Sequence, residues 1–374
     1  MTGLRRGFGR QAGRWQGREG EERGGQHGVD TASENTSMPG VGTPKPGPAP
    51  RRGPWRLGVI SNPLSGSNKR HGLGAVRHFL AEHPGILHRE ARSATEVAAV
   101  LRDFACADVN LIAVNSGDGT VQAVLTSLFA EQVFRPLPLL ALLCGGTTNM
   151  TSKEIGLAGS CIGALRRLIA WAHHGDGEAV ILRRAVLKVE NSSHPEPLCG
   201  MFFGAGCITQ GIQFFHSRVQ KLGLSVGPAH LLIFARFLLG LARREDALVA
   251  PVSAAIRADR ADMAKGDYLL MLISTLDRLI LGLRPFWAQD DNPLHLTAVS
   301  AGFRHLFRGA LPAMAQGHRN RYTSPENGYV SVNAREIRLD MDGAFAIDGE
   351  LFRADRKRGP LVIQEAGPAD FLRL

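Results

Sequence analysis

The pattern of apolar and polar residues changes abruptly at Trp55. Residues 1–54 are rich in Gly, Arg, Pro, Ser and Thr and contain almost no aliphatic residues. Such a segment cannot bury enough apolar surface to offset the entropy lost on ordering, so we expect a disordered tail. Its arginines are compatible with a mitochondrial address, but the acidic residues within 19–22 argue against one. Met38 is a second candidate for the start of the native protein.

Short apolar runs alternate with helical patterns after Trp55. Each apolar run has the length of a buried strand, and a loop of glycine and small polar residues follows it. Strand, glycine loop and helix alternate three times, which predicts a mostly parallel sheet with helices on both faces. We therefore expect a Rossmann-like, doubly wound α/β domain over residues 55–180. The runs and helical patterns are, in chain order, 56–61, 72–83, 96–105, 110–115, 121–130 and 137–143.

The rhythm changes beyond about residue 180. Strand-like pieces separated by turns replace the alternation of strand and helix, which predicts an antiparallel, β-rich second domain over residues 181–374. The apolar stretch 229–244 inside it looks helical instead. The strand-like pieces lie near 181–190, 199–208, 251–258, 268–275, 294–299 and 329–348.

Three loops follow the three predicted strands of the first domain. They are Asn62–Asn68, Ser116–Thr120 and Cys144–Asn149. Because the strands are parallel, all three loops should lie at the carboxyl edge of the sheet, where ligands bind in open α/β folds. Backbone amides approach phosphate oxygens closely where no Cβ intervenes, and a following helix N-terminus adds positive potential. The three loops together predict a site for the phosphate chain of a nucleotide.

Asp118 is the one acidic residue in these loops. Gly117 and Gly119 flank it, so we expect its carboxylate to be exposed at the strand edge rather than packed. It could contact a nucleotide, Mg²⁺ or a substrate. The structural alternative is a helix N-cap, which would contribute about 1 kcal/mol.

Composition and spacing exclude several other classes of protein. The chain has 44 Lys and Arg against 34 Asp and Glu, an excess that favours polyanionic partners. Much of that excess lies in residues 1–54, and no aromatic and basic platform for nucleic acid accompanies it. The five scattered cysteines indicate a reducing compartment and no zinc site. Neither a Walker loop nor a dinucleotide-binding Gly-x-Gly-x-x-Gly occurs.

The motifs resemble those of one kinase family. Ser116-Gly-Asp-Gly-Thr120 is similar to the Gly-Gly-Asp-Gly-Thr signature of the diacylglycerol kinase, sphingosine kinase and NAD kinase superfamily. Asn62-Pro-x-Ser-Gly66, Gly146-Thr-Thr-Asn149 and Asp348-Gly-Glu350 resemble motifs of its lipid-kinase branch. The resemblance implies a C-terminal β-sandwich, ATP in the cleft between the domains, and a last strand, after about residue 355, that can return to the first domain.

The resemblance also implies site residues, carried over position by position. Glu350 would be the general base on the acceptor hydroxyl, and Asp118 is the rival for that role. ATP would bind with Mg²⁺, whose protein ligands remain unassigned. The residues implied in ATP binding are Asn62, Pro63, Ser65, Gly66, Gly117, Asp118, Gly119, Thr120, Gly146, Thr147 and Asn149.

Several positions depart from the family pattern. Cys144 replaces a proline, Gln122-Ala123 replaces Asn-Glu, and Met150 replaces an aspartate. The segment 202–210 lacks the asparagine and aspartate expected in the second domain. These departures leave magnesium handling and substrate choice open, and they favour the alternative of a non-enzymatic nucleotide- or lipid-binding protein.

The sequence contains less information about the acceptor and the partners than about the nucleotide site. We expect a lipid alcohol as substrate, with diacylglycerol as first choice, and contact with an anionic membrane through 229–244 or 276–287. Core packing is the alternative for both stretches. No run of about 18 uncharged apolar residues occurs, so no segment is expected to span a membrane. We expect a cytoplasmic protein that is peripheral at the membrane. No nucleic-acid partner is expected, and a homodimer is left open.

The motifs can also be compared with those of two other enzyme classes. NAD kinase shares the Gly-Asp-Gly-Thr loop, but is not expected to carry both Asn62-Pro-x-Ser-Gly66 and Asp348-Gly-Glu350. Gly223-Leu-Ser-Val-Gly227 formally matches the nucleophile elbow of lipases, but no buried strand precedes it. The lipid kinase therefore remains the principal prediction.

Overall fold

The computed structural model describes residues 54–374, apart from 72, 147–148, 175–177, 215–249, 263–264 and 280–281. The predicted tail up to residue 53, including Met38, therefore lies outside the described residues. The apolar stretch 229–244 and the segment 223–227 also lie outside them.

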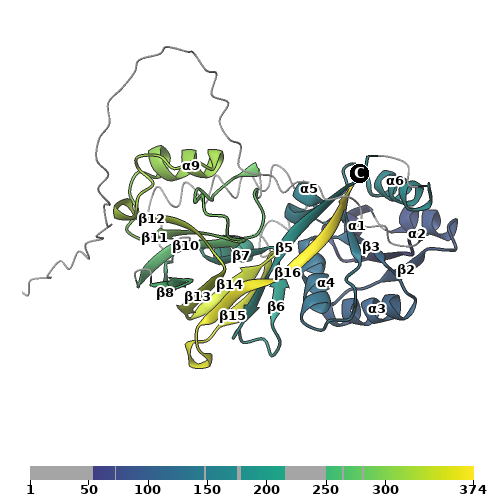
Figure 1. Cartoon of the computed structure of the whole chain (residues 1–374), viewed down its shortest axis with the longest axis horizontal. Coiled ribbons are helices and arrows are strands. Elements are labelled where there is room, and N and C mark those ends of the chain that lie inside the picture. Colours follow the sequence, from purple (N-terminus) through teal and green to yellow (C-terminus); the bar gives the residue numbers. More distant parts are fainter. Residues whose placement is uncertain are drawn as a thin grey trace, which may run out of the picture. The chain divides into compact units, whose positions relative to one another are not determined.

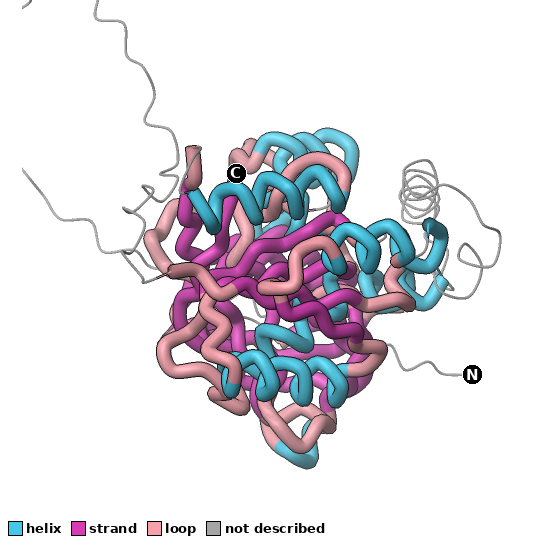
Figure 2. Tube along the Cα trace, turned by 90° about the vertical axis from the view of Figure 1, so that its right-hand side faces the viewer, coloured by secondary structure: helices cyan, strands magenta, loops and turns pink. Residues whose placement is uncertain are grey.

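Parallel strands form the N-terminal part of the sheet, in the order β4-β3-β1-β2. The helices of this region lie on both sides of the strands (Figure 2). The elements are β1 (Leu57–Ser61), α1 (Gly66–His71), α2 (Gly74–Ala81), β2 (Leu87–Glu90), α3 (Ala94–Cys106), β3 (Leu111–Ser116), α4 (Asp118–Phe129), β4 (Leu139–Cys144), α5 (Met150–Ile155) and α6 (Cys161–His174).

Burial explains why most of these elements were visible in the sequence. Every residue of β1 and β3 is buried, because helices cover both faces, and such strands consist of nearly continuous apolar residues. Alternate residues of these strands belong to two separate apolar clusters, one with α3 and α4 and the other with α2 and α6. Strand β2 was not predicted, since its sequence Leu-His-Arg-Glu is polar and it lies at the edge of the sheet.

The C-terminal half is built from antiparallel strands, as predicted. Their inner faces share an apolar cluster centred on residues such as Phe203, Ile273 and Phe345. The elements are β5 (Val180–Glu190), β6 (Leu198–Gly200), β7 (Phe202–Gly206), α7 (Cys207–Phe214), β8 (Val252–Ala258), β9 (Ala261–Asp262), β10 (Gly266–Ser274), β11 (Leu294–Ser300), η5 (Leu306–Ala310), α9 (Leu311–Gln316), η6 (Pro325–Asn327), β12 (Tyr329–Ala334), β13 (Glu336–Met341), β14 (Gly343–Ile347), β15 (Glu350–Ala354), η7 (Arg356–Arg358) and β16 (Leu361–Arg373).

Strand β16 joins the two halves. It pairs antiparallel with β5 over its whole length, and Phe371 pairs with Leu140 of β4 in parallel. In Figure 1 the yellow β16 runs beside the teal β5 towards the helices of the N-terminal half. The strands therefore form one hydrogen-bonded path from β15 to β2. The predicted combination of a Rossmann-like parallel core with antiparallel C-terminal strands is confirmed.

No helix within the described ranges is long and apolar enough to cross a membrane.

Candidate active site

The second and third glycine loops touch each other backbone to backbone. A Cβ atom at Gly146 would overlap the Cα atom of Gly117, and one at Gly145 would lie 2.6 Å from Oδ1 of Asn115. Real Cβ atoms do not approach other atoms this closely, so side chains at 145 and 146 would force these loops apart. The structure therefore brings the loops after β3 and β4 together at the edge of the sheet, as the sequence predicted.

The first loop is tied to the other two by side chains. Ser65 donates from Oγ to the carbonyl of Gly145 (2.9 Å), and Asn62 donates from Nδ2 to Oγ1 of Thr120 (2.9 Å). Pro63 is half-buried in the turn before Gly66, the first residue of α1. Asn62 and Ser65 thus hold the three loops in one arrangement, a role that their spacing alone did not reveal.

Asn149 shapes the third loop. It has a left-handed backbone (φ 50°), and its side chain brackets Gly146, accepting from the amide (2.8 Å) and donating to the carbonyl (3.1 Å). Asparagine tolerates this conformation better than most residues. Thr147, its predicted neighbour in the site, lies outside the described residues.

Asp118 is buried, and the expectation that it would be exposed was wrong. Only 8% of its surface is exposed. Its Oδ2 accepts from the amide of Met150 (2.9 Å) and its Oδ1 from that of Thr151 (3.1 Å), the first two residues of α5. Asp118 therefore caps a helix that follows another loop, rather than its own helix α4. Burial raises the pKa of this carboxyl group.

Glu350 is exposed at the start of β15 and reaches over the N-terminus of α4. A Cβ atom at Gly119 would overlap the Glu350 carboxylate and would lie 3.0 Å from its Cδ. The first amides of a helix lack partners within the helix, and Gly119 belongs to that first turn. The structure therefore brings Glu350 and the Gly117–Thr120 loop together.

Asp348 supports the turn that carries Glu350. It has a left-handed backbone (φ 48°) and is buried. Its carboxylate accepts from the amides of Met201 (3.0 and 3.2 Å) and Phe202 (2.9 Å). Burial raises the pKa of Asp348 well above its ordinary value, and the nearby charge of Asp118 raises it further. Asp348 belongs to the Asp348-Gly-Glu350 motif, but its role in supporting this turn was not predicted from the sequence.

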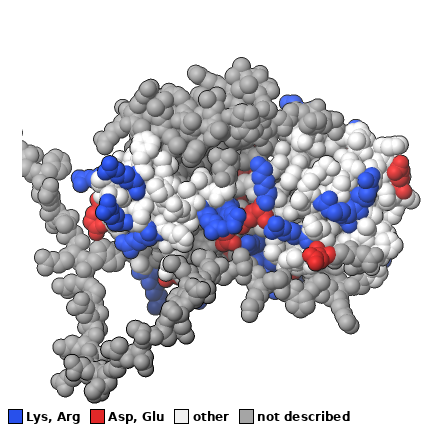
Figure 3. All heavy atoms as spheres, turned by 90° about the horizontal axis from the view of Figure 1, so that it is seen from above, with Lys and Arg blue, Asp and Glu red and all other residues white. Residues whose placement is uncertain are grey.

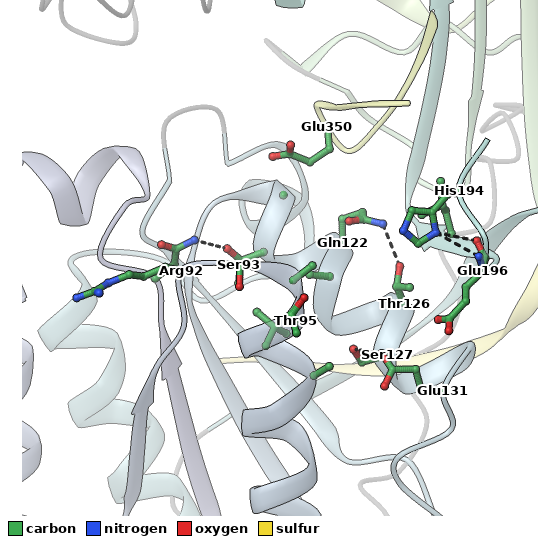
Figure 4. Close-up of a pocket in the computed structure, with 18 of the residues that line it drawn as sticks. Arg92, Ser93, Thr95, Gln122, Thr126, Ser127, Glu131, His194, Glu196 and Glu350 are labelled. Carbon is green, nitrogen blue, oxygen red and sulfur yellow. Dashed lines mark hydrogen bonds between the residues drawn. The ribbon is translucent and has the colours of Figure 1, made fainter. Parts of the chain in front are cut away.

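A cavity of about 610 Å³ extends from this junction between α3 and α4 on one side and β15 and the β5–β6 loop on the other. Figure 4 shows Glu350 at one end, the face of α4 with Gln122 and Thr126 along the wall, and His194 with Glu196 opposite. The lining residues are Asn62, Arg92–Thr95, Val97, Ala98, Arg102, Gly119, Thr120, Gln122, Ala123, Thr126, Ser127, Glu131, His194, Glu196, Leu198 and Glu350–Phe352.

Most of these lining residues were missed by the sequence analysis. Gln122 and Thr126 stand four apart on α4, so they share one face of the helix, and Gln122 donates to Thr126 (2.9 Å). Gln122 is buried and Thr126 is half-buried, and two polar residues on an inward face of a helix could have indicated the wall of a cleft. His194 and Glu196 carry no such signal, because they lie in a loop far away in sequence.

One ion pair lies in the wall of the cavity. Arg102 pairs with Glu131 (2.7 Å), and Arg92 extends away from the other labelled side chains in Figure 4. Within the described part of the chain, no three His, Cys, Asp or Glu side chains are grouped as metal ligands. Both carboxylate oxygens of Asp118 accept from backbone amides, whereas Glu350 is exposed with its carboxylate over Gly119.

Comparisons with known proteins agree with the motifs. Residues 56–175 match the family described as the diacylglycerol kinase catalytic domain. No curated protein gives a significant match. A crystal structure described as a diacylglycerol kinase from Bacillus anthracis str. Sterne has 18% identity and a TM-score of 0.51, covering 85% of this chain and 96% of its own. A second structure from that organism has the same identity and coverage and a TM-score of 0.56.

A more distant match is an NAD kinase from Archaeoglobus fulgidus in complex with ATP, at 12% identity and a TM-score of 0.43, covering 84% of this chain and 92% of its own. At these identities the structural matches establish the fold alone. The family match covers the three glycine loops and ends before the C-terminal strands. Residues 56–175 are thus similar to a diacylglycerol kinase catalytic domain, the family that the motifs indicated, and the findings support a kinase-type enzyme.

Proposed function

We propose that this protein is an ATP-dependent lipid kinase that phosphorylates a lipid hydroxyl, with diacylglycerol as the preferred acceptor. One observation carries the proposal. The carboxylate of Glu350 lies over Gly119 at the N-terminus of α4, where a helix offers amides to a phosphate group. A base and a phosphate-binding element therefore meet at one end of the cavity.

The loops fit a nucleotide. Asn62 of the first loop and Gly119 and Thr120 of the second line the cavity, whose volume is within the range of small-molecule sites. ATP would supply the phosphoryl group. The residues proposed to hold it are Asn62, Pro63, Ser65, Gly66, Gly117, Gly119, Thr120, Gly146, Thr147 and Asn149.

Glu350 would accept the proton of the lipid hydroxyl. The hydroxyl oxygen would bond to the terminal phosphorus of ATP as the bond from this phosphorus to the leaving ADP oxygen breaks. Phosphoryl transfer depends mainly on in-line placement and on compensation of phosphate charge. A base within hydrogen-bond reach of the hydroxyl adds to this. Glu350 is exposed, so its carboxylate is accessible to an acceptor that enters the cavity.

Asp118 is proposed as a positioning residue rather than the base. Both of its oxygens already accept amide hydrogens from Met150 and Thr151. Holding the start of α5, it fixes the end of the Gly146–Asn149 loop beside the Gly117–Thr120 loop. Mg²⁺ would then be held chiefly by nucleotide phosphates, as is common for this ion, since no acidic cluster in the described residues offers it a protein cage.

The test is transfer of label from γ-labelled ATP, with Mg²⁺, to defined acceptors: diacylglycerol, a sphingoid base, ceramide and NAD. Wild type is compared with Glu350→Ala and Asp118→Ala, and with Glu365→Gln, an exposed carboxylate on β16, as the matched control. We expect labelled diacylglycerol from wild type and from the control only. ATP binding without labelling of any acceptor would overturn the proposal.

That last outcome would favour a second candidate, a non-enzymatic nucleotide- or lipid-binding protein. The occupied carboxylate of Asp118 is the observation in its favour. The accessible carboxylate of Glu350 argues against a non-enzymatic binding protein, because such a protein does not need a base at the phosphate end of its site.

A further inference from the structure

The segment from Phe303 to Tyr322, which includes η5 and α9, has an unusual composition. It carries Arg304, Arg308, Arg319 and Arg321 and no Asp or Glu. All four arginines are exposed. Figure 3, which looks down on this side, shows several Lys and Arg side chains at the end of the molecule that carries α9 in Figure 1, with acidic side chains beside them; other Lys and Arg side chains lie in the middle and at the opposite end.

Phe307 projects from the same segment. It is 63% exposed, the highest value among the large apolar side chains that the structure describes as exposed. Its neighbour Leu306 packs inward on the cluster that contains Trp287 and Tyr329. An exposed phenylalanine between two arginines is the arrangement that suits a membrane interface, with the ring among acyl chains and the guanidinium groups at phosphates.

Hydrogen bonds and ring contacts fix this surface in shape. Asn320 donates to the carbonyl of Gly309 (2.9 Å), and the rings of His305 and Tyr322 lie 4.9 Å apart. The guanidinium of Arg321 lies over the Tyr322 ring, 4.7 Å from its centroid. The segment with Arg319 and Arg321 is therefore held against the turn that carries Phe307 and Arg308.

The same segment is packed onto an apolar layer that reaches the candidate active site. Ala313 and Met314 of α9 belong to a cluster that also includes Met150, whose amide binds Asp118. The stretch 276–287 is hydrogen-bonded to α9, because the amide of Arg284 donates to the carbonyl of Met314 (2.7 Å). Leu276 and Trp287 of that stretch are buried, so these two residues pack in the core.

We propose that Arg304, Phe307, Arg308, Arg319 and Arg321, here called the α9 surface, form the site at which the protein docks on an anionic membrane. The arginines would contact lipid phosphates and Phe307 would enter the acyl region. Glu326 lies beside this surface: a hydrogen bond with Ser324 lowers the pKa of its carboxyl group, and the nearby charge of Arg319 also lowers it. The proposed docking is argued from charge and shape alone. The role of docking, which would be to bring the enzyme to an acceptor in the membrane, rests on the proposed function.

The test is co-sedimentation of the full chain with vesicles of phosphatidylcholine alone or with about 30% phosphatidylglycerol, at low and high salt. Arg304→Gln/Arg308→Gln is compared with Arg89→Gln/Arg166→Gln, which removes two exposed arginines from β2 and α6. Phe307→Ala is compared with Phe307→Trp. We expect Arg304→Gln/Arg308→Gln and Phe307→Ala to bind anionic vesicles about tenfold more weakly than wild type. Arg89→Gln/Arg166→Gln and Phe307→Trp should bind them as wild type does.

Three outcomes would overturn the proposal: no binding of wild type to anionic vesicles, equal binding by Arg304→Gln/Arg308→Gln, or binding to duplex DNA that depends on the arginines while vesicle binding does not. Transfer of phosphate to a short-chain, water-soluble diacylglycerol separates docking from catalysis. The docking variants should retain this activity and lose activity on vesicles. Vesicle docking without kinase activity would remove the proposed function and leave the docking surface in place.

Discussion

The carboxylate of Glu350 occupies the space that a side chain at residue 119 would need. Gly119 is in the first turn of α4, and Glu350 comes from a hairpin more than two hundred residues later. This contact links the phosphate-binding loop of the N-terminal half to the C-terminal strands. Glycine at 119 is therefore explained by its partner rather than by backbone conformation.

The Gly119→Ala substitution should displace Glu350. Alanine is normally favoured over glycine inside a helix by about 0.5–1 kcal/mol, so the free energy of unfolding should hardly fall. Lipid phosphorylation should fall about tenfold or more, because the base is misplaced. The measurement is kcat with urea unfolding alongside. In a Glu350→Gln background the same substitution should add little, and full additivity of the two effects would contradict the contact.

The Asp118→Ala substitution should destabilise α5. Its carboxylate accepts from the Met150 and Thr151 amides, and loss of such a cap typically costs about 1–2 kcal/mol. Urea unfolding measures the change. Asp103→Ala, which removes only an exposed ion pair with Arg89, should cost about 0.5 kcal/mol or less. Equal effects of the two substitutions would show that Asp118 does not cap α5.

Glu154 should hold α5 to the chain after β10. It accepts from the amides of Asp277 (3.1 Å) and Arg278 (3.2 Å) and contacts Arg184 (3.5 Å). Glu154→Ala would remove a partner from the half-buried amide of Asp277 and from the Arg184 side chain, which is only 13% exposed, at a cost of about 1–3 kcal/mol. Thermal unfolding, with Glu365→Gln as control, measures the loss. A change within the error of the control would rule out this connection.

Asp348 should make stability fall as pH rises. Burial raises its pKa in the folded protein, so the native state binds more protons than the unfolded state between the two pKa values. Its contribution is complete below the unfolded pKa, near ~4, and is lost as the pH rises through the folded pKa. The slope is at most about 1.4 kcal/mol per pH unit.

The comparison variant is Asp348→Asn, which cannot titrate. The free energy of unfolding of wild type minus that of the variant should decrease as the pH rises above about 4. Urea unfolding at several pH values measures it. A difference that increases with pH would mean that the folded carboxyl group has a lowered pKa instead.

The sequence predicted the glycine loops correctly because each follows an apolar strand such as Leu111–Ser116, and parallel strands end at one edge. It failed for Asp118 because the amides that bury its carboxylate lie 32 and 33 residues further along the chain. No local pattern near Gly117 or Gly119 indicates that the Met150 and Thr151 amides are its partners. Glycine neighbours suggested exposure, whereas the structure uses them for close contact between loops.

Long-range pairing explains the remaining differences. The β16–β5 pair contains residues as far apart as Val180 and Arg373, so its position could not be derived from local periodicity. The place of Glu350 followed from resemblance alone. The wall formed by Gln122 and Thr126 is local, and its four-residue spacing was available in the sequence.

The central claim is that Glu350 acts on the acceptor hydroxyl at the end of the nucleotide site. The most direct measurement is kcat for phosphorylation of diacylglycerol by Glu350→Gln, beside the affinity of the same variant for ATP. The account predicts that kcat falls by about 10²–10⁴ while the Kd for ATP changes by less than about threefold and Glu365→Gln remains fully active. A Glu350→Gln enzyme with wild-type kcat would contradict it.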